Sequence, residues 1–241
     1  MDYILIIILV LALVSVAGIA SVFLLGGKSP LAQHNTVAIL GLCDSGKTSL
    51  YTYLQYGKLV ATQTSMVENE GPFKLESNKG LEVPLNLVDV PGHEKLRFKY
   101  SEFLPITKAV LFVIDSTTVH QQIRPIAEYL YDILTHSATV KRTIPVLILC
   151  NKHDMLMALE AKAIQTTLET EINKLRSTQS ASLDQTGDDA AAEVKFLGYE
   201  NEEFKFEHVP NRIEFLETSL VDDEMRVALR GEIAEFVLCG K

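Results

Sequence analysis

One segment of the sequence combines residue types and a spacing that are suited to holding a phosphate group. Residues Gly41–Thr48 match the pattern G-x-x-x-x-G-K-[ST]. In such a loop the backbone N–H groups turn toward a phosphate, Lys47 reaches the β- and γ-phosphates of a nucleotide, and the Thr48 hydroxyl binds Mg²⁺. The sequence therefore predicts a nucleotide-phosphate site, with these candidate contacts: Gly41, Asp44, Ser45, Gly46, Lys47, Thr48 and Ser49.

The sequence on either side of this loop favours that interpretation over a chance match. Val37–Leu40 is apolar, as expected of a buried strand. Leu50 and Leu54 are four residues apart, as on one face of a helix. A loop between a strand and a helix places the phosphate at the helix N-terminus, which carries a partial positive charge. A side chain at Gly46 would crowd that phosphate.

Two further motifs follow apolar segments and select the nucleotide. Asp89–Gly92 matches D-x-x-G, in which the carboxylate holds Mg²⁺ through water and the Gly92 N–H senses the γ-phosphate. Asn151–Asp154 matches N-K-x-D, in which the aspartate accepts hydrogen bonds from N1 and the 2-amino group of guanine. Adenine lacks this pair of donors. Either motif alone is often only a turn, but their order after the phosphate loop predicts binding of GTP or GDP with Mg²⁺. Asn151, Lys152 and Asp154 are the candidate base contacts.

Two segments without a specific motif complete the predicted site. Thr218 and Ser219 follow a β-like segment and could offer backbone N–H groups to the guanine O6. Thr64 is the candidate switch residue that closes on Mg²⁺ and the γ-phosphate, with Thr62 and Ser65 as rivals. For Thr64, Thr62 and Ser65 alike, the alternative interpretation is a loop residue with no role in binding. The predicted Mg²⁺ ligands are thus Thr48, Thr64 and, through water, Asp89.

The segments that carry these motifs alternate apolar runs with helical periodicity. This pattern predicts an α/β fold with a mostly parallel central sheet and helices on both faces. Four apolar runs are continuous, as in strands that are buried on both faces. An alternating run suits an edge strand, and three stretches have helical spacing. The expected strands are Val37–Leu40, Phe73–Glu76, Leu85–Val88, Val110–Ile114, Val146–Cys150 and Arg212–Leu216, and the expected helices span 123–134, 156–175 and 225–238.

The N-terminal residues read as a membrane anchor. Ile4–Leu25 has no charged residue, and as a helix it would span about 33 Å, enough to cross a bilayer. A cleaved signal peptide is the alternative, but no Lys or Arg precedes the run and the run is too long. We expect a transmembrane anchor with flanks at 1–28, a linker at 29–35 and one nucleotide-binding domain at 36–241. The polar stretch at about 177–195 is predicted to be a flexible insert.

Composition excludes other classes of function. The formal net charge is −9, which argues against a nucleic acid as a direct partner. The three cysteines stand at unrelated spacings, so neither a zinc site nor a disulfide framework is predicted.

On these motifs the chain resembles the Arf/Sar-type small GTPases and, among them, the β-subunit family of the signal recognition particle receptor. The resemblance is carried by Gly41–Thr48, Asp89–Arg97, Asp115–Thr117 and Asn151–Lys152, with a membrane span in place of a myristoylated helix. It implies a small-GTPase domain in the cytosol, anchored by a single pass in the endoplasmic reticulum membrane. It also implies that the GTP form holds the N-terminal domain of the receptor α subunit through switch regions, which would serve targeting of ribosomes to the translocation channel. By analogy of fold, the partner surface would lie at 64–68 and 93–100.

Two other functions remain open on the sequence. A trafficking GTPase that recruits coat or tether proteins must leave the membrane, which a permanent span prevents. A purely structural GTPase relative is disfavoured by the intact motif residues.

Hydrolysis of GTP requires a water molecule held in line with the γ-phosphate. The residue after D-x-x-G commonly orients this water, and here it is His93. The alternative is a switch histidine that only packs or contacts a partner. Cys43 stands where Ras-like enzymes often have glycine, and its side chain can obstruct the transition-state geometry. We therefore expect slow GTP hydrolysis in the absence of a partner.

Overall fold

The computed structural model describes residues 34–76, 80, 82–183, 197–199 and 202–238. The chain divides into two compact units, Met1–His34 and Asn35–Lys241. The predicted anchor at 1–28 and most of the 29–35 linker lie outside the described residues. None of the described helices has both the length and the apolar composition that are needed to cross a bilayer.

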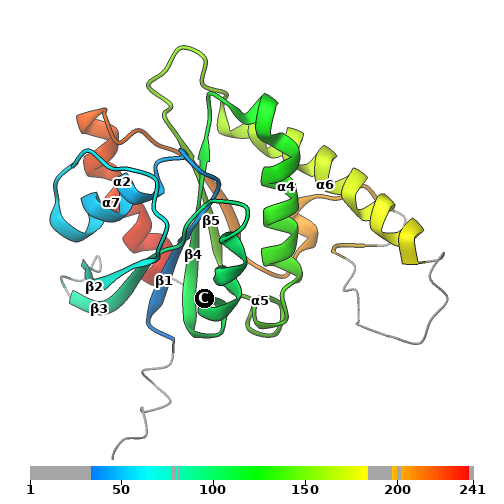
Figure 1. Ribbon diagram of the computed structural model, residues 1–241, viewed down its shortest axis with the longest axis horizontal. Helices are drawn as coiled ribbons and strands as arrows, with labels where there is room; N and C mark the ends of the chain where they lie inside the picture. Colours follow the sequence, from blue (N-terminus) through cyan, green and yellow to red (C-terminus); the bar gives the residue numbers. More distant parts are fainter. Residues whose placement is uncertain (1–33, 77–79, 81, 184–196, 200–201, 239–241) are drawn as a thin grey trace, which may run out of the picture. The chain divides into compact units, whose positions relative to one another are not determined.

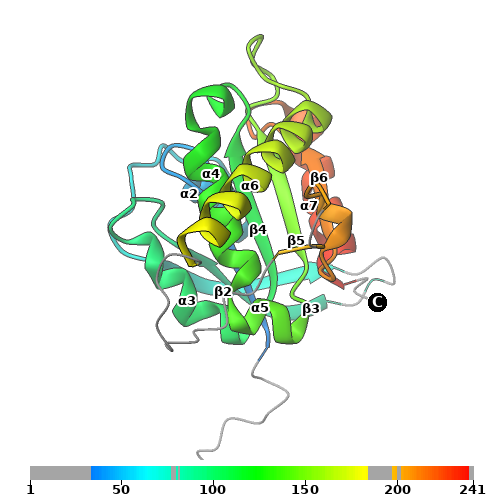
Figure 2. The same cartoon turned by 90° about the vertical axis from the view of Figure 1, so that its right-hand side faces the viewer.

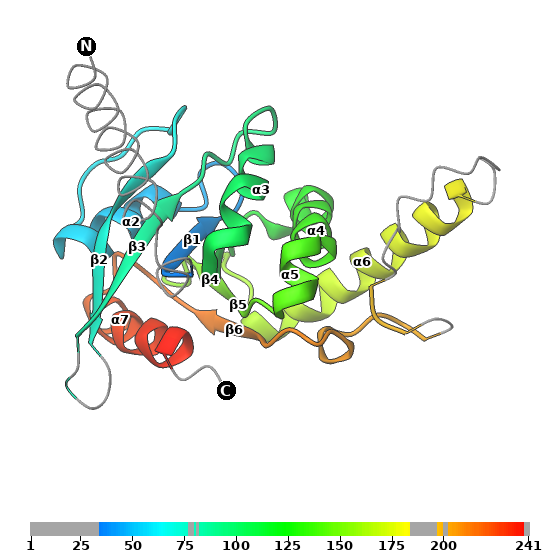
Figure 3. The same ribbon diagram turned by 90° about the horizontal axis from the view of Figure 1, so that it is seen from below.

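A six-stranded sheet forms the centre of the second unit (Figures 1 and 3). The strand order is β2-β3-β1-β4-β5-β6, and only the β2–β3 pair is antiparallel. This arrangement confirms the predicted α/β fold with a mostly parallel sheet, and it confirms the predicted edge strand, which is β2. The strands are β1 (Thr36–Leu40), β2 (Asn69–Glu76), β3 (Glu82–Asp89), β4 (Thr107–Asp115), β5 (Val146–Asn151) and β6 (Ile213–Glu217).

Helices cover both faces of this sheet (Figures 1 and 2). The helices α2 and α7 lie on one face, and α4 and α6 lie on the other. The short helices α3 and α5 accompany the second group. Their bounds are α2 (Lys47–Tyr56), α3 (Tyr100–Phe103), α4 (Val119–Thr135), α5 (Ser137–Arg142), α6 (Ala161–Leu183) and α7 (Asp223–Leu238).

The helix α6 differs most from its predicted span. The stretch 156–175 was expected to be helical, but α6 begins only at Ala161 and continues to Leu183. The predicted flexible insert at 177–195 is therefore helical in its first part, and residues 184–195 lie outside the described residues. Because Ser177–Leu183 contains no glycine or proline, nothing in that stretch ends the helix.

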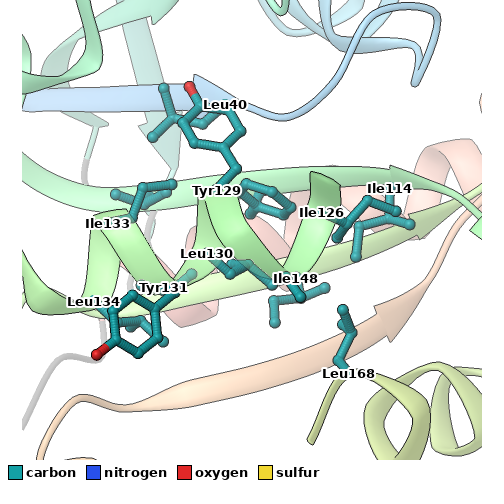
Figure 4. Close-up of a cluster of buried hydrophobic side chains, with 14 of the residues drawn as sticks. Leu40, Ile114, Ile126, Tyr129, Leu130, Tyr131, Ile133, Leu134, Ile148 and Leu168 are labelled. Carbon is teal, nitrogen blue, oxygen red and sulfur yellow. The ribbon is translucent and has the colours of Figure 1, made fainter. Parts of the chain in front are cut away.

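Alternate side chains of the buried strands enter two separate apolar clusters. In β1, Val37 and Ile39 pack on the α2 and α7 side, whereas Ala38 and Leu40 pack on the α4 side. Figure 4 shows the second cluster, in which α4 lies over the sheet with Leu130 and its neighbours directed at residues such as Ile148. Each fully buried side chain of this size contributes about 1.5–3 kcal/mol to folding. Packing on both faces explains why the strand sequences are continuously apolar.

The sheet topology brings the sequence motifs to one edge. The phosphate loop follows β1 directly, and β3, β4, β5 and β6 end at Asp89, Asp115, Asn151 and Glu217. The carboxyl ends of parallel strands share one edge of a sheet, which is where ligands of open α/β sheets bind. Residues that are up to 176 positions apart in the sequence therefore meet there because of the fold alone.

Candidate functional site

A cavity of about 530 Å³ lies over the phosphate loop. Its walls are formed by the phosphate loop, the segment 62–65, the D-x-x-G turn and Lys152. Two predicted phosphate-loop contacts, Gly41 and Ser45, do not line this cavity. Ser45 Oγ donates a hydrogen bond to the Leu42 carbonyl at 3.0 Å, and a Cβ on Gly41 would be 2.2 Å from the Val113 carbonyl oxygen. The predicted residues that line the cavity are Asp44, Gly46, Lys47, Thr48, Ser49, Thr64, Asp89, Gly92 and Lys152.

Gly46 is required by a neighbouring side chain as well as by its own backbone. Its φ of 96° lies in the left-handed region, and a Cβ there would be 2.3 Å from Nδ2 of Asn151. That Nδ2 donates a hydrogen bond to the Ser45 carbonyl at 2.8 Å. Asn151 thus ties the end of β5 to the phosphate loop, and only glycine leaves space for it.

Lys47 and Asp89 place two opposite charges inside the protein. Lys47 is only 6% exposed, and its Nζ donates to the Leu42 carbonyl at 2.6 Å. Burial lowers the pKa of Lys47, and the nearby Asp89 acts in the opposite direction. Burial likewise raises the pKa of Asp89, against the effect of hydrogen bonds from Thr48 and Asn69 and of the Lys47 charge. A bound anion would therefore meet a lysine that is already desolvated.

A polar cluster surrounds the carboxylate of Asp89. Its Oδ2 accepts hydrogen bonds from Thr48 Oγ1 at 2.8 Å and from Asn69 Nδ2 at 3.0 Å. Its Oδ1 is buried and has no hydrogen-bond partner among the described residues. Such an oxygen is suited to a cation or to a water molecule that the cation holds. Sequence reasoning missed Asn69, because an asparagine at the start of a strand carries no motif.

The structure brings Ser65 into this cluster. Ser65 Oγ lies 3.2 Å from Thr48 Oγ1 and accepts a hydrogen bond from Asn69 Nδ2 at 3.3 Å. Thr64, the predicted switch residue, lines the cavity but is exposed, and Thr62 contacts Ser49 instead. Of the three candidates in this segment, Ser65 is the one in contact with the predicted Mg²⁺ ligand Thr48.

The D-x-x-G turn lies against the phosphate loop. A Cβ on Gly92 would be 2.6 Å from the Gly41 carbonyl oxygen and 2.7 Å from the backbone nitrogen of Cys43. His93 follows, and its side chain is exposed and does not line the cavity. Its Nδ1 accepts a hydrogen bond from the Lys95 N–H at 3.2 Å. The predicted water-positioning role of His93 therefore stays a prediction.

A second cavity of about 500 Å³ adjoins the first and shares Gly46, Ser49 and Lys152 with it. Asp154 and Thr117 supply polar groups at its wall. Its other walls are mostly apolar, as a flat aromatic ring requires. The apolar residues are Leu59, Val60, Ala61, Met155, Leu220 and Val221.

Side chains from neighbouring loops hold the residues of this second cavity. Lys152 has a left-handed backbone with a φ of 63°, and its Nζ donates to Asp115 Oδ2 at 2.7 Å. Ser219 Oγ donates to Asp154 Oδ1 at 2.6 Å. The Thr218 N–H donates to the Cys150 carbonyl at 2.9 Å, so this N–H already has a hydrogen-bond partner within the protein. Of the predicted pair, Ser219 is the one whose side chain contacts the Asp154 carboxylate.

Comparison with known proteins gives one consistent result. The family model of the signal recognition particle receptor beta subunit matches residues 32–213. The signal recognition particle receptor subunit beta of Rattus norvegicus is 41% identical over 189 residues, which cover 78% of this chain and 69% of that protein. A solved structure of the mammalian signal recognition particle receptor matches with a TM-score of 0.71 at 38% identity, covering 83% of this chain and 99% of that one.

A second solved structure shares the fold at lower identity. It is the GTP-bound SRb/SRX complex of the signal recognition particle receptor from Chaetomium thermophilum. It matches with a TM-score of 0.69 at 22% identity, over 83% of this chain and 99% of that one.

Proposed function

This chain belongs to the signal recognition particle receptor beta-subunit family, and on that premise we propose that its GTP-bound state docks the receptor α subunit at the endoplasmic reticulum membrane. The observation that carries this proposal is the pair of adjoining cavities at the carboxyl edge of the sheet. One is lined by the phosphate loop and Asp89, and the other by Asp154. The two share Gly46, Ser49 and Lys152 in their walls, so one nucleotide could place its phosphates in the first and its base in the second.

The second cavity is suited to guanine. Asp154 lines it, and Ser219 occupies only one of its two carboxylate oxygens. The other oxygen is available for the N1–H and 2-amino group of guanine. A purine with an acceptor at N1 offers no donor to this carboxylate at that position, which discriminates against it. GTP and GDP are therefore the proposed ligands.

The residues at the first cavity fit Mg²⁺. Among the described residues the buried Asp89 Oδ1 has no partner, Thr48 donates to the same carboxylate, and Ser65 Oγ lies 3.2 Å from Thr48 Oγ1. Together they form the oxygen-rich donor set that this ion prefers. Bound Mg²⁺ would supply positive charge to the phosphate oxygens. We propose Thr48 and Ser65 as ligands, with Asp89 acting through water. Lys47 would bind the β- and γ-phosphates once it exchanges the Leu42 carbonyl for them.

Hydrolysis is proposed to be slow in the isolated chain. His93 would have to leave its contact with the Lys95 N–H and turn toward the cavity before it could hold a water molecule. The half-buried Cys43 lines the same cavity and narrows the space beside the γ-phosphate. A partner that reorients His93 would raise the rate.

The proposed partner surface is apolar and adjoins the phosphate cavity. Met66, Val67 and Phe98 are between 59% and 66% exposed, and they lie in the segments 64–68 and 93–100. Exposed residues of this kind supply the central contacts of protein interfaces. The relative from Chaetomium thermophilum is named as a complex of SRb-GTP with SRX. That complex supports a partner interface that forms in the GTP-bound state. The proposed membrane anchor lies in residues 1–28.

The test is capture of partners from a membrane extract with the 241-residue chain, loaded either with a non-hydrolysable GTP analogue or with GDP. We expect only the GTP form to retain the receptor α subunit. A Phe98→Asp variant should lose the α subunit, whereas Val227→Asp, at an equally exposed position on α7, should retain it. Capture of coat or tether proteins, or equal capture in both nucleotide states, would contradict the proposal.

A further inference from the structure

The four side chains of the N-K-H-D segment each contact a different neighbouring element. Asn151 reaches the phosphate loop, Lys152 reaches the end of β4, and Asp154 is held by the serine that follows β6. The fourth side chain, His153, lies against Glu217, the last residue of β6. This contact has no place in the recognition of the base described above.

The carboxylate of Glu217 divides its two oxygens between two elements. Oε1 accepts a hydrogen bond from the backbone N–H of Ala161, the first residue of α6, at 2.7 Å. Oε2 lies 3.3 Å from Nε2 of His153. The first N–H groups of a helix lack partners within the helix, so this carboxylate also caps α6 and suits its dipole. Glu217 thus joins β6, α6 and the N-K-H-D segment at one point.

The backbone fixes the same two loops beside each other. The His153 N–H donates to the Thr218 carbonyl at 3.1 Å, and the Thr218 N–H donates to the Cys150 carbonyl. His153 itself makes the first of these bonds, and Glu217 directly precedes Thr218. Asp154 and Ser219, whose 2.6 Å contact orients the base-reading carboxylate, come next along the two loops. A shift at the Glu217–His153 contact would therefore move the Asp154–Ser219 contact.

We propose that Glu217 and His153 are a positioning pair for guanine recognition, an inference that rests on the proposed function. Neither side chain lines the base cavity, so neither touches the base. Together they set the separation of the two base-reading loops and hence the direction of the Asp154 carboxylate. Removing their contact lowers the affinity for guanine through Asp154.

The test compares GDP with inosine diphosphate, whose base lacks the 2-amino group. An Asp154 that is out of place loses two hydrogen bonds to guanine but only one to hypoxanthine. In the 241-residue chain, we expect Glu217→Gln to weaken GDP binding roughly five- to tenfold and to change inosine diphosphate binding much less. Glutamine keeps one oxygen for Ala161 and loses the charge that faces His153. Glu214→Gln, on the same strand but exposed and paired with Arg212, should change neither affinity.

Substitutions at His153 give an independent second test. His153→Gln keeps a side-chain N–H that can face Glu217. His153→Leu has a side chain of similar size to histidine but no hydrogen-bond donor. We expect the glutamine variant to keep the preference for GDP over inosine diphosphate and the leucine variant to lose it. Melting temperatures are measured alongside, because a merely structural role would lower them without changing this preference.

Two results would overturn the inference in distinguishable ways. If the unmodified chain shows no preference for GDP over inosine diphosphate, the proposed guanine site itself is wrong. If it shows the preference and both Glu217→Gln and His153→Leu retain it in full, the guanine site stands and the positioning pair is wrong.

Discussion

Glu68 and Lys99 form an ion pair with 2.6 Å between Oε2 and Nζ, and this pair joins the two segments that flank the phosphate cavity. Glu68 directly precedes β2, and Lys99 lies in the helical turn that follows the D-x-x-G motif. Both side chains are less than 30% exposed. The pair therefore holds the segment carrying Ser65 close to the segment carrying Gly92.

We expect Lys99→Met to speed the release of GDP by about two- to fivefold, because partly exposed ion pairs contribute at most about 1 kcal/mol. A fluorescent GDP analogue reports the rate. The matched control is Lys74→Met, which removes an ion pair of the same 2.6 Å length at the other end of the β2–β3 hairpin. Equal rates in the two variants would contradict a role for the Glu68–Lys99 pair in retaining nucleotide.

Replacing Ser65 should change the dependence of GTP binding on Mg²⁺. Ser65→Ala removes the hydroxyl that lies 3.2 Å from Thr48 Oγ1, so about tenfold more Mg²⁺ should be needed for half-maximal GTP binding. Thr64→Ala should have little effect, because that side chain is exposed. A titration of Mg²⁺ at fixed GTP gives the comparison. A larger effect at Thr64 would restore it as the switch residue.

Adding one methyl group to Gly92 should destabilise the protein. The new Cβ would lie 2.6–2.7 Å from backbone atoms of the phosphate loop, which cannot move aside as a flexible side chain can. We expect Gly92→Ala to lower the free energy of unfolding by about 1–3 kcal/mol. Gly231→Ala is the control, since Gly231 lies in α7 and no atom of the described residues comes within 4 Å of the added Cβ. That change should raise the free energy of unfolding by about 0.5–1 kcal/mol. Urea denaturation measures both.

Acid should remove the stabilising effect of Asp115. Burial acts to raise the pKa of Asp115, but hydrogen bonds from Lys152 and Thr117 outweigh it and hold the pKa below its ordinary value. A carboxyl whose pKa is lower in the folded state stabilises the fold above its unfolded pKa of about 3.9, and this effect disappears as the pH falls through the folded pKa.

We therefore expect Asp115→Asn to be less stable than the unmodified chain by about 1 kcal/mol at pH 7, a value reduced for the partial exposure of Lys152. The difference in free energy of unfolding should shrink below about pH 4. Glu235→Gln, on the exposed side of α7, serves as the control. A difference that persists unchanged in acid would mean that the charge of Asp115 is not what stabilises the fold.

The fold could be predicted because its signals are local. Four of the expected strands are continuous apolar runs, and burial on both faces makes such runs conspicuous, as in Val146–Cys150. The phosphate loop and N-K-x-D segment could be located for the same reason, since their residues are consecutive. The start of α6 could not be predicted, because its first N–H bonds to Glu217, which is 56 residues away in the sequence.

The parts of the site that could not be predicted depend on contacts between distant segments. Asn69 has no motif, yet the antiparallel pairing of β2 with β3 places it opposite Asp89. The choice between Thr64 and Ser65 depends on which hydroxyl faces Thr48, and composition carries no information on that direction. The sequence offered the right group of candidates, and the tertiary structure distinguishes among them.

The anchoring of the N-K-H-D segment by several strands has a consequence for biosynthesis. Its side chains depend on the phosphate loop after β1, on Asp115 at the end of β4 and on Ser219 beyond β6. Ser219 is synthesised after β6, the last strand of the described sheet. A nascent chain that has completed the phosphate loop but not β6 therefore cannot yet orient Asp154. On the proposed function, selectivity for guanine is therefore acquired only after β6 has joined the sheet.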